Sequence, residues 1–515
     1  MAVKGFLGID AGTQGLAVVF TNENLEVLAT GDGHYDMVPG LDEGNYEQNP
    51  ADWLAALRTA MKDLRSKLTT AIEVVAIGIS GQMHGEVLCD EHGQPLSSAR
   101  LWCDSRNDTE ERELTTKLGV KMPKRITAAR WLWTIRNQRE KARQVCRITT
   151  PSGWLAFQLT GQWNLGIGDA SGMFPVDQAT LDFDKGLLEK LESGIADSFV
   201  NPLSQLLPTI RKAGEDAGSL TSSGAELLGL SPSIPVAAAE GDQPAALAGS
   251  LIADAGMVSV SFGTSVCANS IGDRAFGGVD KAVDHFCAVD GKPINMVWLR
   301  NGTTFMNSVV EMFGGVLEND RSNVFSKIMP LVEQAPDDCG GLLALPFMDD
   351  EPGIGVGRGG TAMLIGLNAD NATPGNAVKA ALLATMFNLR LGSEVLAQQG
   401  FPRNQLVLSG GLTKTPQLAQ VLANVFNVSV TLLESAEEGT ACGAALLAKF
   451  RYEKINGSSN DWSQFVASQR NTSVKNFSPD ADRVAIYESV YRRYKKLLAT
   501  QLPLQNALQD DGTSN

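Results

Sequence analysis

The feature of this sequence that most constrains its fold is a strand–turn–strand unit that occurs twice. Residues 5–20 contain an apolar run, a turn with Gly12-Thr13 and a second apolar run, and residues 256–268 repeat this order around Gly263-Thr264. An apolar run on each side of a glycine-rich turn predicts a β-hairpin. The two Gly-Thr pairs lie 251 positions apart, about half of the chain. The spacing therefore predicts two related lobes.

The segments between these hairpins alternate between helical and strand patterns. After Asn49-Pro50, a typical helix start, apolar residues recur at steps of three and four up to Leu68. Buried-strand patterns cover residues 74–79 and 406–408, and helical patterns cover 376–399, 438–450 and 484–502. The alternation predicts an α/β fold in which sheets carry helices on their faces. Binding sites in such sheets lie beyond the carboxyl ends of the strands, where the glycine-rich turns fall.

The length of the chain fits this organisation. At about 150 residues per domain, 515 residues make about three domains or two large ones. We expect a first lobe at residues 1–249, a second lobe at 250–502 and a flexible tail at 503–515. With 43% hydrophobic and 20% charged residues, each lobe can bury a substantial core.

Charge and cysteine usage restrict the partners and the compartment. The formal net charge of −15 argues against nucleic acid or an anionic membrane surface as a partner, because binding to either depends on clustered Lys and Arg. The seven cysteines are scattered and form no C-x-x-C pair, which is typical of reduced thiols. No apolar stretch reaches about 18 residues, the length that suggests a membrane span. We therefore expect a cytoplasmic protein.

The first turn, Asp10–Gln14, has the residue types of a phosphate site. Glycine lets the backbone approach an anion, exposed N–H groups form a concave nest, and Thr13 adds a hydroxyl donor. Asp10 supplies a carboxylate that can hold Mg²⁺ through water. The alternative is an ordinary tight turn, but the second Gly-Thr turn favours a polyphosphate ligand. Gly410-Gly411 is a third place for close backbone approach, and none of these turns matches the P-loop or the G-x-G-x-x-G pattern.

Asp242 is the candidate general base. It lies between Gly241 and Gln243 after the apolar run 234–239, so it is expected at a strand end that faces a cleft. The alternative is a turn-forming Asp, which is common beside Gly and Pro. Phosphoryl transfer to an alcohol needs a carboxylate for the hydroxyl proton, a metal that bridges phosphates, and donors around the transferred group. Asp242 and the two turns supply that set together.

Two further segments carry candidate sugar contacts, each with a structural alternative. Met83 and His84 follow the strand pattern at 74–79, where His84 can donate to a substrate hydroxyl and Met83 can form an apolar wall. A lone His is more often a structural residue. Asp104 and Arg106, after Trp102, can bind hydroxyls or pair with each other.

In this order and at these separations, the motifs resemble those of the FGGY carbohydrate kinases. The resemblance covers roughly residues 5–450. It rests on Asp10–Gln14, Ser80–Gly85, Trp102–Arg106, Thr127–Trp133, Asp242, Gly263-Thr264, Ser409–Asn424 and Glu438–Ala445. One departure is Arg130, where the family usually has Lys. A second is the segment 346–359, which lacks the Glu-Arg of many relatives.

The resemblance implies two actin-like lobes (the ribonuclease H-like, ASKHA class) that close over a central cleft. The sugar would bind mostly to the first lobe and ATP to the second. Asp242 would take the proton of the sugar hydroxyl, and Asp10 would organise Mg²⁺. The resemblance also implies a nucleotide site, formed by Thr13, Gln14, Gly263, Thr264, Gly410 and Gly411.

Within the family, the segment Gln82–Gly85 is most similar to that of the xylulose kinases. The expected reaction is therefore ATP-dependent phosphorylation of a ketose, D-xylulose to D-xylulose 5-phosphate. The expected sugar contacts are Met83, His84, Trp102, Asp104, Arg106, Asp242 and Gln243. Gln243 departs from the Asn of xylulose kinases and resembles the glycerol and sedoheptulose kinases, which leaves sedoheptulose and ribulose as alternatives. An actin-like ATP-binding chaperone or scaffold is the alternative from another class, and a homodimer stays open.

Overall fold

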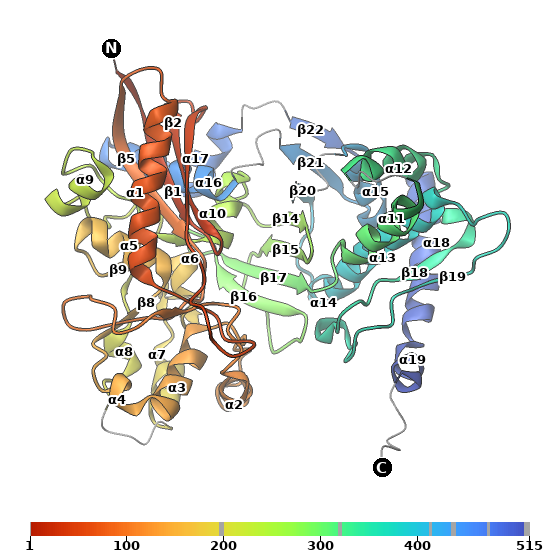
Figure 1. Cartoon of the computed structure of the whole chain (residues 1–515), viewed down its shortest axis with the longest axis horizontal. Coiled ribbons are helices and arrows are strands. Elements are labelled where there is room, and N and C mark those ends of the chain that lie inside the picture. The colour runs from red at the N-terminus through yellow and green to blue at the C-terminus, as the bar shows by residue number, and fades with distance from the viewer. Residues whose placement is uncertain are drawn as a thin grey trace.

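The computed structural model describes residues 2–194, 200–317, 322–410, 415–433, 439–470 and 474–508. Within these residues the chain forms two bodies, each built on one large sheet (Figure 1). One hydrophobic core lies between Leu7 and Ala239 and a second between Val258 and Tyr494. The α/β class with two lobes is therefore confirmed.

The first sheet contains the predicted first hairpin. Its strand order is β13-β5-β1-β2-β3, with the bounds β1 (Val3–Ala11), β2 (Gly15–Asn22), β3 (Val27–His34), β5 (Ile72–Gly81) and β13 (Glu240–Gly241). β1 and β2 pair antiparallel, while β5 runs parallel to β1 and β13 runs parallel to β5. The carboxyl ends of three parallel strands therefore meet at one edge of this sheet.

The second sheet repeats this core arrangement. Its order is β16-β17-β15-β14-β20-β21-β22, with the bounds β14 (Met257–Phe262), β15 (Val266–Ile271), β16 (Val283–Cys287), β17 (Pro293–Leu299), β20 (Gln405–Gly410), β21 (Ser429–Leu433) and β22 (Val474–Phe477). β14 and β15 form an antiparallel hairpin, and β20 lies parallel to β14, as β5 lies parallel to β1. The repeat predicted from the two Gly-Thr turns is confirmed by this shared topology.

The first half of the chain surrounds its sheet with helices and short strand pairs. The side chain of Asn49 accepts a hydrogen bond from the N–H of Ala51, as its place before Pro50 predicts. The helices are α1 (Pro50–Lys67), α2 (Asp108–Leu118), α3 (Thr127–Asn137), α4 (Arg139–Ala142), α5 (Pro151–Thr160), α6 (Ile167–Ala170), α7 (Lys185–Glu192), α8 (Leu203–Leu206), α9 (Ser222–Leu228) and α10 (Asp242–Gly249). The short strands are β4 (Glu47–Gln48), β6 (Val87–Cys89), β7 (Ala99–Arg100), β8 (Arg147–Thr149), β9 (Asn164–Gly166), β10 (Val176–Asp177), β11 (Asp182–Phe183) and β12 (Thr209–Arg211).

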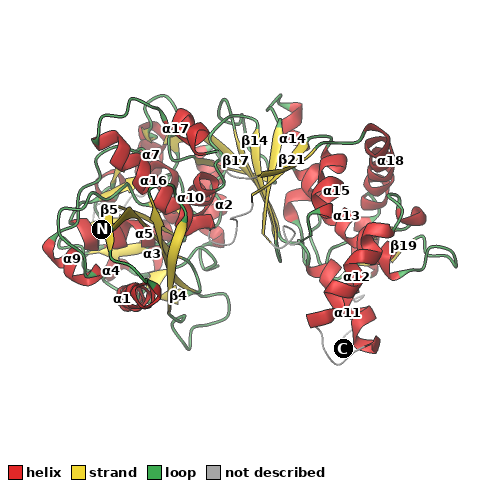
Figure 2. Ribbon diagram, turned by 90° about the horizontal axis from the view of Figure 1, so that it is seen from above, coloured by secondary structure: helices red, strands yellow, loops and turns green. Residues whose placement is uncertain are grey.

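Most helices of the second half lie on the face of the second sheet that points away from the first lobe. Figure 2 shows this sheet nearly edge-on. They are α11 (Thr304–Leu317), α12 (Ser322–Gln334), α13 (Pro374–Gly392), α14 (Glu394–Gln398), α15 (Gln417–Phe426), α16 (Gly439–Ile455), α17 (Trp462–Gln469), α18 (Ala481–Leu498) and α19 (Gln501–Ala507). Two 3₁₀ turns, Cys339–Gly341 and Pro352–Ile354, and the strand pair β18 (Leu343–Leu345) and β19 (Met363–Ile365) complete the lobe.

Three sequence expectations differ from the structure in detail. The helix expected over 376–399 is divided at Ser393 into α13 and α14. The turn expected at Gly410-Gly411 is wrong for Gly410, because β20 continues past the predicted strand 406–408 to Gly410, and Gly411 lies outside the described residues. Helix α19 continues to Ala507, so an ordered turn extends into the segment expected to be a tail.

Helix α16 comes from the second half of the chain but packs on the first sheet, against β1 and β5 (Figure 1, blue among red). Glycines make this approach possible. A Cβ atom at Gly78 of β5 would lie 1.8 Å from the carbonyl oxygen of Ala444, and one at Gly8 of β1 would lie 2.0 Å from that of Ala441. α16 also crosses α10, where Gly443 faces the carbonyl oxygen of Ala245. Because of this crossing, the boundary at 249/250 stays a prediction.

Among the described residues, one helical stretch is long and apolar enough to cross a membrane by length and composition. It covers Pro374–Gln398, which contains α13 and α14, and 67% of its most apolar window is buried inside the protein. It lies in the second hydrophobic core, where Val378, Leu382 and Met386 are fully buried. The apolar character of this helix is accounted for by core packing.

We predict that Gly78→Ala destabilises the protein, because the new methyl group meets backbone that α16 cannot move without leaving the sheet. Overpacking of this kind costs about 1–3 kcal/mol. Thermal unfolding should show a clear drop in Tm. The matched control is Gly439→Ala at the start of the same helix, where an added Cβ meets no atom within 4 Å. An equal Tm for Gly78→Ala and the wild type would contradict this account of the packing.

Candidate active site

The predicted site segments follow three strand ends that share one register. Asp10 of β1 lies opposite Ser80 of β5, and Ser80 lies opposite Glu240 of β13. The hydroxyl of Ser80 donates to Oδ1 of Asp10 at 2.8 Å. The turn at residues 12–14, the Met83-His84 pair and Asp242 therefore leave the sheet side by side.

The first turn presents backbone donors. Among the described residues, the N–H groups of Gly12, Thr13 and Gln14 donate to no protein acceptor. Their carbonyl side is held instead: the hydroxyl of Tyr35 lies 2.5 Å from the oxygen of Gly12, and Nε2 of Gln48 donates to that of Thr13 at 2.7 Å. Unpaired N–H groups in a fixed concave turn are what an anion needs.

The side chain of Thr13 is less free than expected. Its hydroxyl donates to Oε1 of Gln82 at 3.3 Å and accepts from Nε1 of Trp102 at 3.0 Å. These bonds join the first turn to two of the predicted sugar segments. The backbone amides rather than this hydroxyl are the open donors of the turn.

The second turn is built in the same way. The N–H groups of Thr264 and Ser265 have no acceptor within the described chain. The oxygen of Gly263 accepts from the N–H and the hydroxyl of Thr303, at 2.8 and 2.9 Å, and the N–H of Gly302 donates to the oxygen of Thr264 at 2.9 Å. Gly410 ends β20 opposite Phe262, so it lies at the same sheet edge as this turn.

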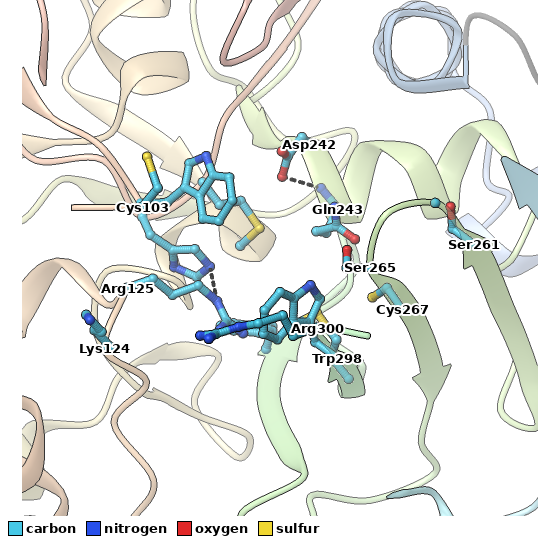
Figure 3. Close-up of a pocket in the computed structure, with 16 residues that line it drawn as sticks. Cys103, Lys124, Arg125, Asp242, Gln243, Ser261, Ser265, Cys267, Trp298 and Arg300 are labelled. Atoms are coloured by element: carbon cyan, nitrogen blue, oxygen red, sulfur yellow. Dashed lines mark hydrogen bonds between the residues drawn. The ribbon is translucent and has the colours of Figure 1, made fainter. Parts of the chain in front are cut away.

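A cavity of about 600 Å³ lies between the two lobes. Figure 3 shows Asp242 and Gln243 on one side of it and Arg300 with Trp298 on another. It is lined from the first lobe by Met83, His84, Trp102, Cys103, Lys124, Arg125, Asp242 and Gln243, and from the second by Ser261, Gly263, Ser265, Cys267, Phe286, Met296, Trp298 and Arg300. The structure thus brings together Met83, His84, Trp102, Asp242, Gln243 and Gly263, all predicted from the sequence.

Asp242 is the first residue of α10 and borders the cavity. Burial, with Asp10 and Asp169 nearby as like charges, raises its pKa from 3.8 to about 7. The N–H of Gln243 donates to its Oδ1 at 2.8 Å and opposes this shift. A carboxylate whose pKa lies near the operating pH is suited to accept a proton.

Two buried acids beside Asp242 were missed by the sequence analysis. Oδ2 of Asp169 accepts from the hydroxyls of Thr150 and Ser152, at 2.6 and 2.5 Å, and burial raises the pKa of Asp169 to about 7. Glu240 accepts from the N–H of Asp169 at 2.9 Å, and burial raises its pKa as well. The only sequence signal for Asp169 is a Gly-rich segment, 166–172, without strong periodicity.

His84 is enclosed rather than open to a ligand. Its Nδ1 lies 3.0 Å from the oxygen of Gly172, and its Nε2 accepts from Nε of Arg125 at 3.3 Å. Burial and Arg125 lower the pKa of His84 to about 3, so the ring is neutral with its proton on Nδ1. Both ring nitrogens are engaged, as in the structural alternative considered from the sequence, although the ring borders the cavity.

Asp104 and Arg106 pair with each other, which was the second option from the sequence. Nη2 of Arg106 lies 2.5 Å from Asp104 and 2.7 Å from Glu47. Neither Asp104 nor Arg106 lines the cavity, and their role in sugar binding stays a prediction. Arg130 is fully buried and donates to the carbonyl oxygens of His84 and Trp102, at 3.0 and 2.8 Å, so it holds two site segments together.

Gln243 makes a contact across the lobe boundary. Nδ2 of Asn269, on β15, donates to its Oε1 at 3.0 Å. This bond fixes the orientation of the amide, and the NH₂ group of Gln243 donates to no described residue. Because Gln is one methylene group longer than Asn, the side chain of Gln243 reaches Asn269 in the second lobe.

The residues fit a hard divalent cation that is held mostly by other ligands. Among the described residues, no group of three His, Cys, Asp or Glu side chains could enclose a metal by itself. Asp10 offers one hard oxygen ligand beside the open amides of the first turn, which is the usual protein share of a Mg²⁺ site completed by water and phosphates. The fit is therefore to Mg²⁺ that arrives with a nucleotide.

Two family domains match this chain. The N-terminal domain of the FGGY family of carbohydrate kinases matches residues 6–249, and its C-terminal domain matches residues 258–452. The chain belongs to the FGGY family of carbohydrate kinases. It is therefore a sugar kinase with two actin-like lobes, and the chaperone alternative is set aside.

Known members of the family resemble the chain over nearly its whole length. The xylulose kinase of Haemophilus influenzae is 26% identical in an alignment of 510 positions that covers 95% of this chain and 98% of that protein. The crystal structure of xylulose kinase from Rhodospirillum rubrum aligns with a TM-score of 0.81 at 20% identity over 97% and 99% of the two chains. Gluconate kinase from Lactobacillus acidophilus also reaches 0.81, at 19% identity over 97% and 99%. A xylulose kinase and a gluconate kinase therefore match this fold equally well, so the fold alone does not identify the sugar substrate.

We predict that kcat/KM for the sugar falls about tenfold for each pH unit below pH 7, because only ionised Asp242 can accept a proton. The raised pKa also means that the folded state binds this proton more tightly than the unfolded state. Asp242 therefore costs stability as pH rises from 3.8 to about 7. Asp242→Asn should raise Tm at pH 8 more than at pH 4. A flat kcat/KM profile between about pH 5.5 and 8 would contradict the assignment.

Proposed function

We propose that the protein transfers the γ-phosphoryl group of ATP to the terminal hydroxyl of a ketose, with D-xylulose as the first choice. The observation that carries this proposal is that Asp242 and the second Gly-Thr turn border one cavity from opposite lobes. A base and phosphate donors that face each other across a cavity are the requirements of phosphoryl transfer to an alcohol. The resemblance to xylulose kinases over nearly the full chain supports the choice of sugar.

In this proposal Asp242 accepts the proton of the attacked hydroxyl. The sugar oxygen forms a bond to the γ-phosphorus while the bond from that phosphorus to the bridging oxygen breaks, and ADP leaves. The N–H groups of residues 12–14, 264 and 265 hold phosphate oxygens as negative charge moves among them. These turns are held in place, because the carbonyl oxygens of Gly12, Thr13, Thr264 and Ser265 accept hydrogen bonds from other residues of the protein.

Mg²⁺, bound beside Asp10, would neutralise the phosphates of the nucleotide. Thr13, Gln14, Gly263, Thr264, Gly410 and Gly411 stay the proposed nucleotide residues, and Gly411 lies outside the described part. Burial of the cavity between the lobes would limit the access of water, which competes with the sugar for ATP.

The seven cysteines are free thiols. This supports a reducing compartment, and we propose the cytoplasm as the place of the reaction. The proposed partners are small molecules, the sugar and ATP. Nucleic acid and anionic membranes are not proposed as partners, since the net charge is −15.

Sedoheptulose and ribulose are the alternative acceptors. We favour the ketopentose because the longer side chain of Gln243 reaches Asn269 and forms a hydrogen bond with it, and does not form a deeper pocket.

The test is product formation from purified protein, Mg-ATP and a panel of D-xylulose, D-ribulose and sedoheptulose. We expect D-xylulose 5-phosphate as the main product. Asp242→Asn should lower the rate at least about 10²-fold, since general base catalysis supplies about 10²–10⁴-fold. Asp52→Asn, at an exposed position in the first turn of α1, is the matched control and should keep the wild-type rate. Efficient turnover of sedoheptulose without turnover of D-xylulose would overturn the choice of sugar.

A further inference from the structure

The phosphate donors described above are all uncharged backbone amides. The charge of a transferred phosphoryl group is spread over its oxygens, and sites for this reaction place cationic groups beside them. Neither Gly-Thr turn contains a Lys or an Arg. A cationic side chain beside the γ-phosphate would have to come from a neighbouring element.

Arg300 lies beside the second Gly-Thr turn because of the register of the second sheet. β15 and β17 pair antiparallel, with Leu299 opposite Val266. Arg300 therefore leaves β17 at the point where Ser265 leads into β15. Both residues border the cavity, together with Gly263 of the same turn.

The alternation of side chains along β17 directs Arg300 into the cavity. Met296 and Trp298, four and two positions earlier, also border the cavity, whereas Leu299 is fully buried in the second core. Figure 3 shows Arg300 and Trp298 together at one side of the cavity and Asp242 at another. Among the described second-lobe residues that border the cavity, Arg300 is the one cation.

The backbone that follows Arg300 is held in place. The N–H of Asn301 donates to Oε2 of the buried Glu351 at 2.9 Å. The N–H of Gly302 donates to the oxygen of Thr264 at 2.9 Å, which ties this end of β17 to the second Gly-Thr turn. The base of the Arg300 side chain is therefore fixed relative to the turn.

The guanidinium of Arg300 is held more loosely. Its Nη1 donates to Oδ1 of Asp350, in an ion pair whose two side chains are 48% and 31% exposed. Within the described residues, Nε and Nη2 of Arg300 make no hydrogen bond. An exposed ion pair contributes little to stability. A phosphate carries more charge than a carboxylate, and two of its oxygens can bind the forked guanidinium at once, so it can displace Asp350.

We propose that Arg300 is a catalytic residue that leaves Asp350 when a nucleoside triphosphate binds and donates hydrogen bonds to the γ-phosphate oxygens. It adds positive charge to the uncharged amides of the second turn, and it stabilises the γ-phosphoryl group as this group moves to the sugar hydroxyl. Arg300 and the turn belong to the same lobe, so the contact needs no movement between the lobes. The inference rests on the proposed function, because it takes the second turn as the site of the γ-phosphate.

The test compares the binding of Mg-ADP with that of Mg-AMP-PNP, a non-hydrolysable ATP analogue that keeps the γ-phosphate, by calorimetry without sugar. Arg300→Met removes the guanidinium and keeps an unbranched side chain. It should weaken AMP-PNP binding at least about tenfold, as expected for a hydrogen bond to a charged group, and leave ADP binding within about twofold. Arg300→Lys keeps the charge without the fork, so AMP-PNP binding should fall by less.

Turnover gives a second readout. At saturating Mg-ATP, Arg300→Met should lower kcat about 10²–10³-fold, the loss expected for one donor to a developing charge. The KM for the sugar should stay near the wild-type value, because the contact is to phosphate. A residue that only supported the fold would lower Tm and change both constants.

Two variants serve as controls. Arg358→Met removes an exposed second-lobe Arg that does not border the cavity, and it should keep both nucleotide affinities and kcat. Asp350→Asn removes the carboxylate that competes with phosphate, and it should bind AMP-PNP at least as tightly as the wild type. Tm values show whether each variant folds.

The possible results separate this inference from the proposed function. AMP-PNP binding that is unchanged in Arg300→Met, weakened no more than ADP binding, or weakened equally in Arg358→Met or Asp350→Asn would overturn the role of Arg300. A wild type that does not bind AMP-PNP, or an Arg300→Met variant that loses affinity for D-xylulose alone, would overturn it as well.

If AMP-PNP binding depends on Arg300 but the wild type forms no phosphosugar from any ketose of the panel, the proposed function fails and the phosphate contact stands. Phosphosugar formation with an unchanged kcat in Arg300→Met leaves the kinase and removes Arg300 from its mechanism.

Discussion

The close approach of α16 to the first sheet is the contact on which the rest of the structure depends. This helix belongs to the second half of the chain. Its backbone packs directly against the backbones of β1 and β5, because Gly8 and Gly78 carry no side chain at the contact. The same helix crosses α10, and α10 begins with Asp242. The position of the proposed base, the spacing of the lobes and the cavity between them are therefore set by packing among very small residues. Larger side chains at these points would separate the lobes.

Much of the fold follows from local patterns in the sequence. The two hairpins around Gly-Thr turns, the capped helix after Asn49 and the parallel strands are all indicated by spacing and turn chemistry. The break at Ser393 and the extension of β20 through Gly410 are not. Both depend on tertiary packing, because the helical period continues past Ser393 and glycine at 410 is equally compatible with a strand or a turn. The packing of α16 on the first sheet is also invisible to local patterns.

The residues of the site also divide into those that the sequence predicts and those that it does not. Residues that follow strand ends, such as Met83 and Asp242, were predicted because their positions along the chain carry the signal. Arg125 and Asp169 were missed because their roles arise from partners far away in sequence, 159 positions in the bond from Arg125 to Asp284. The engagement of His84 could not be foreseen either, since it takes Gly172 and Arg125 together to occupy its ring. Contacts between charged residues of the two lobes produce no periodic pattern in the sequence.

The central claim is that a carboxylate and two sets of phosphate donors face one gap between the lobes. The most direct measurement is a crystal structure with an open-chain ketose and a non-hydrolysable ATP analogue bound together. The account predicts the terminal hydroxyl at about 2.6–3.2 Å from Asp242, with the γ-phosphate between that hydroxyl and the amides of the Gly-Thr turns. A γ-phosphate that points away from Asp242, or a sugar bound outside this cavity, would contradict it.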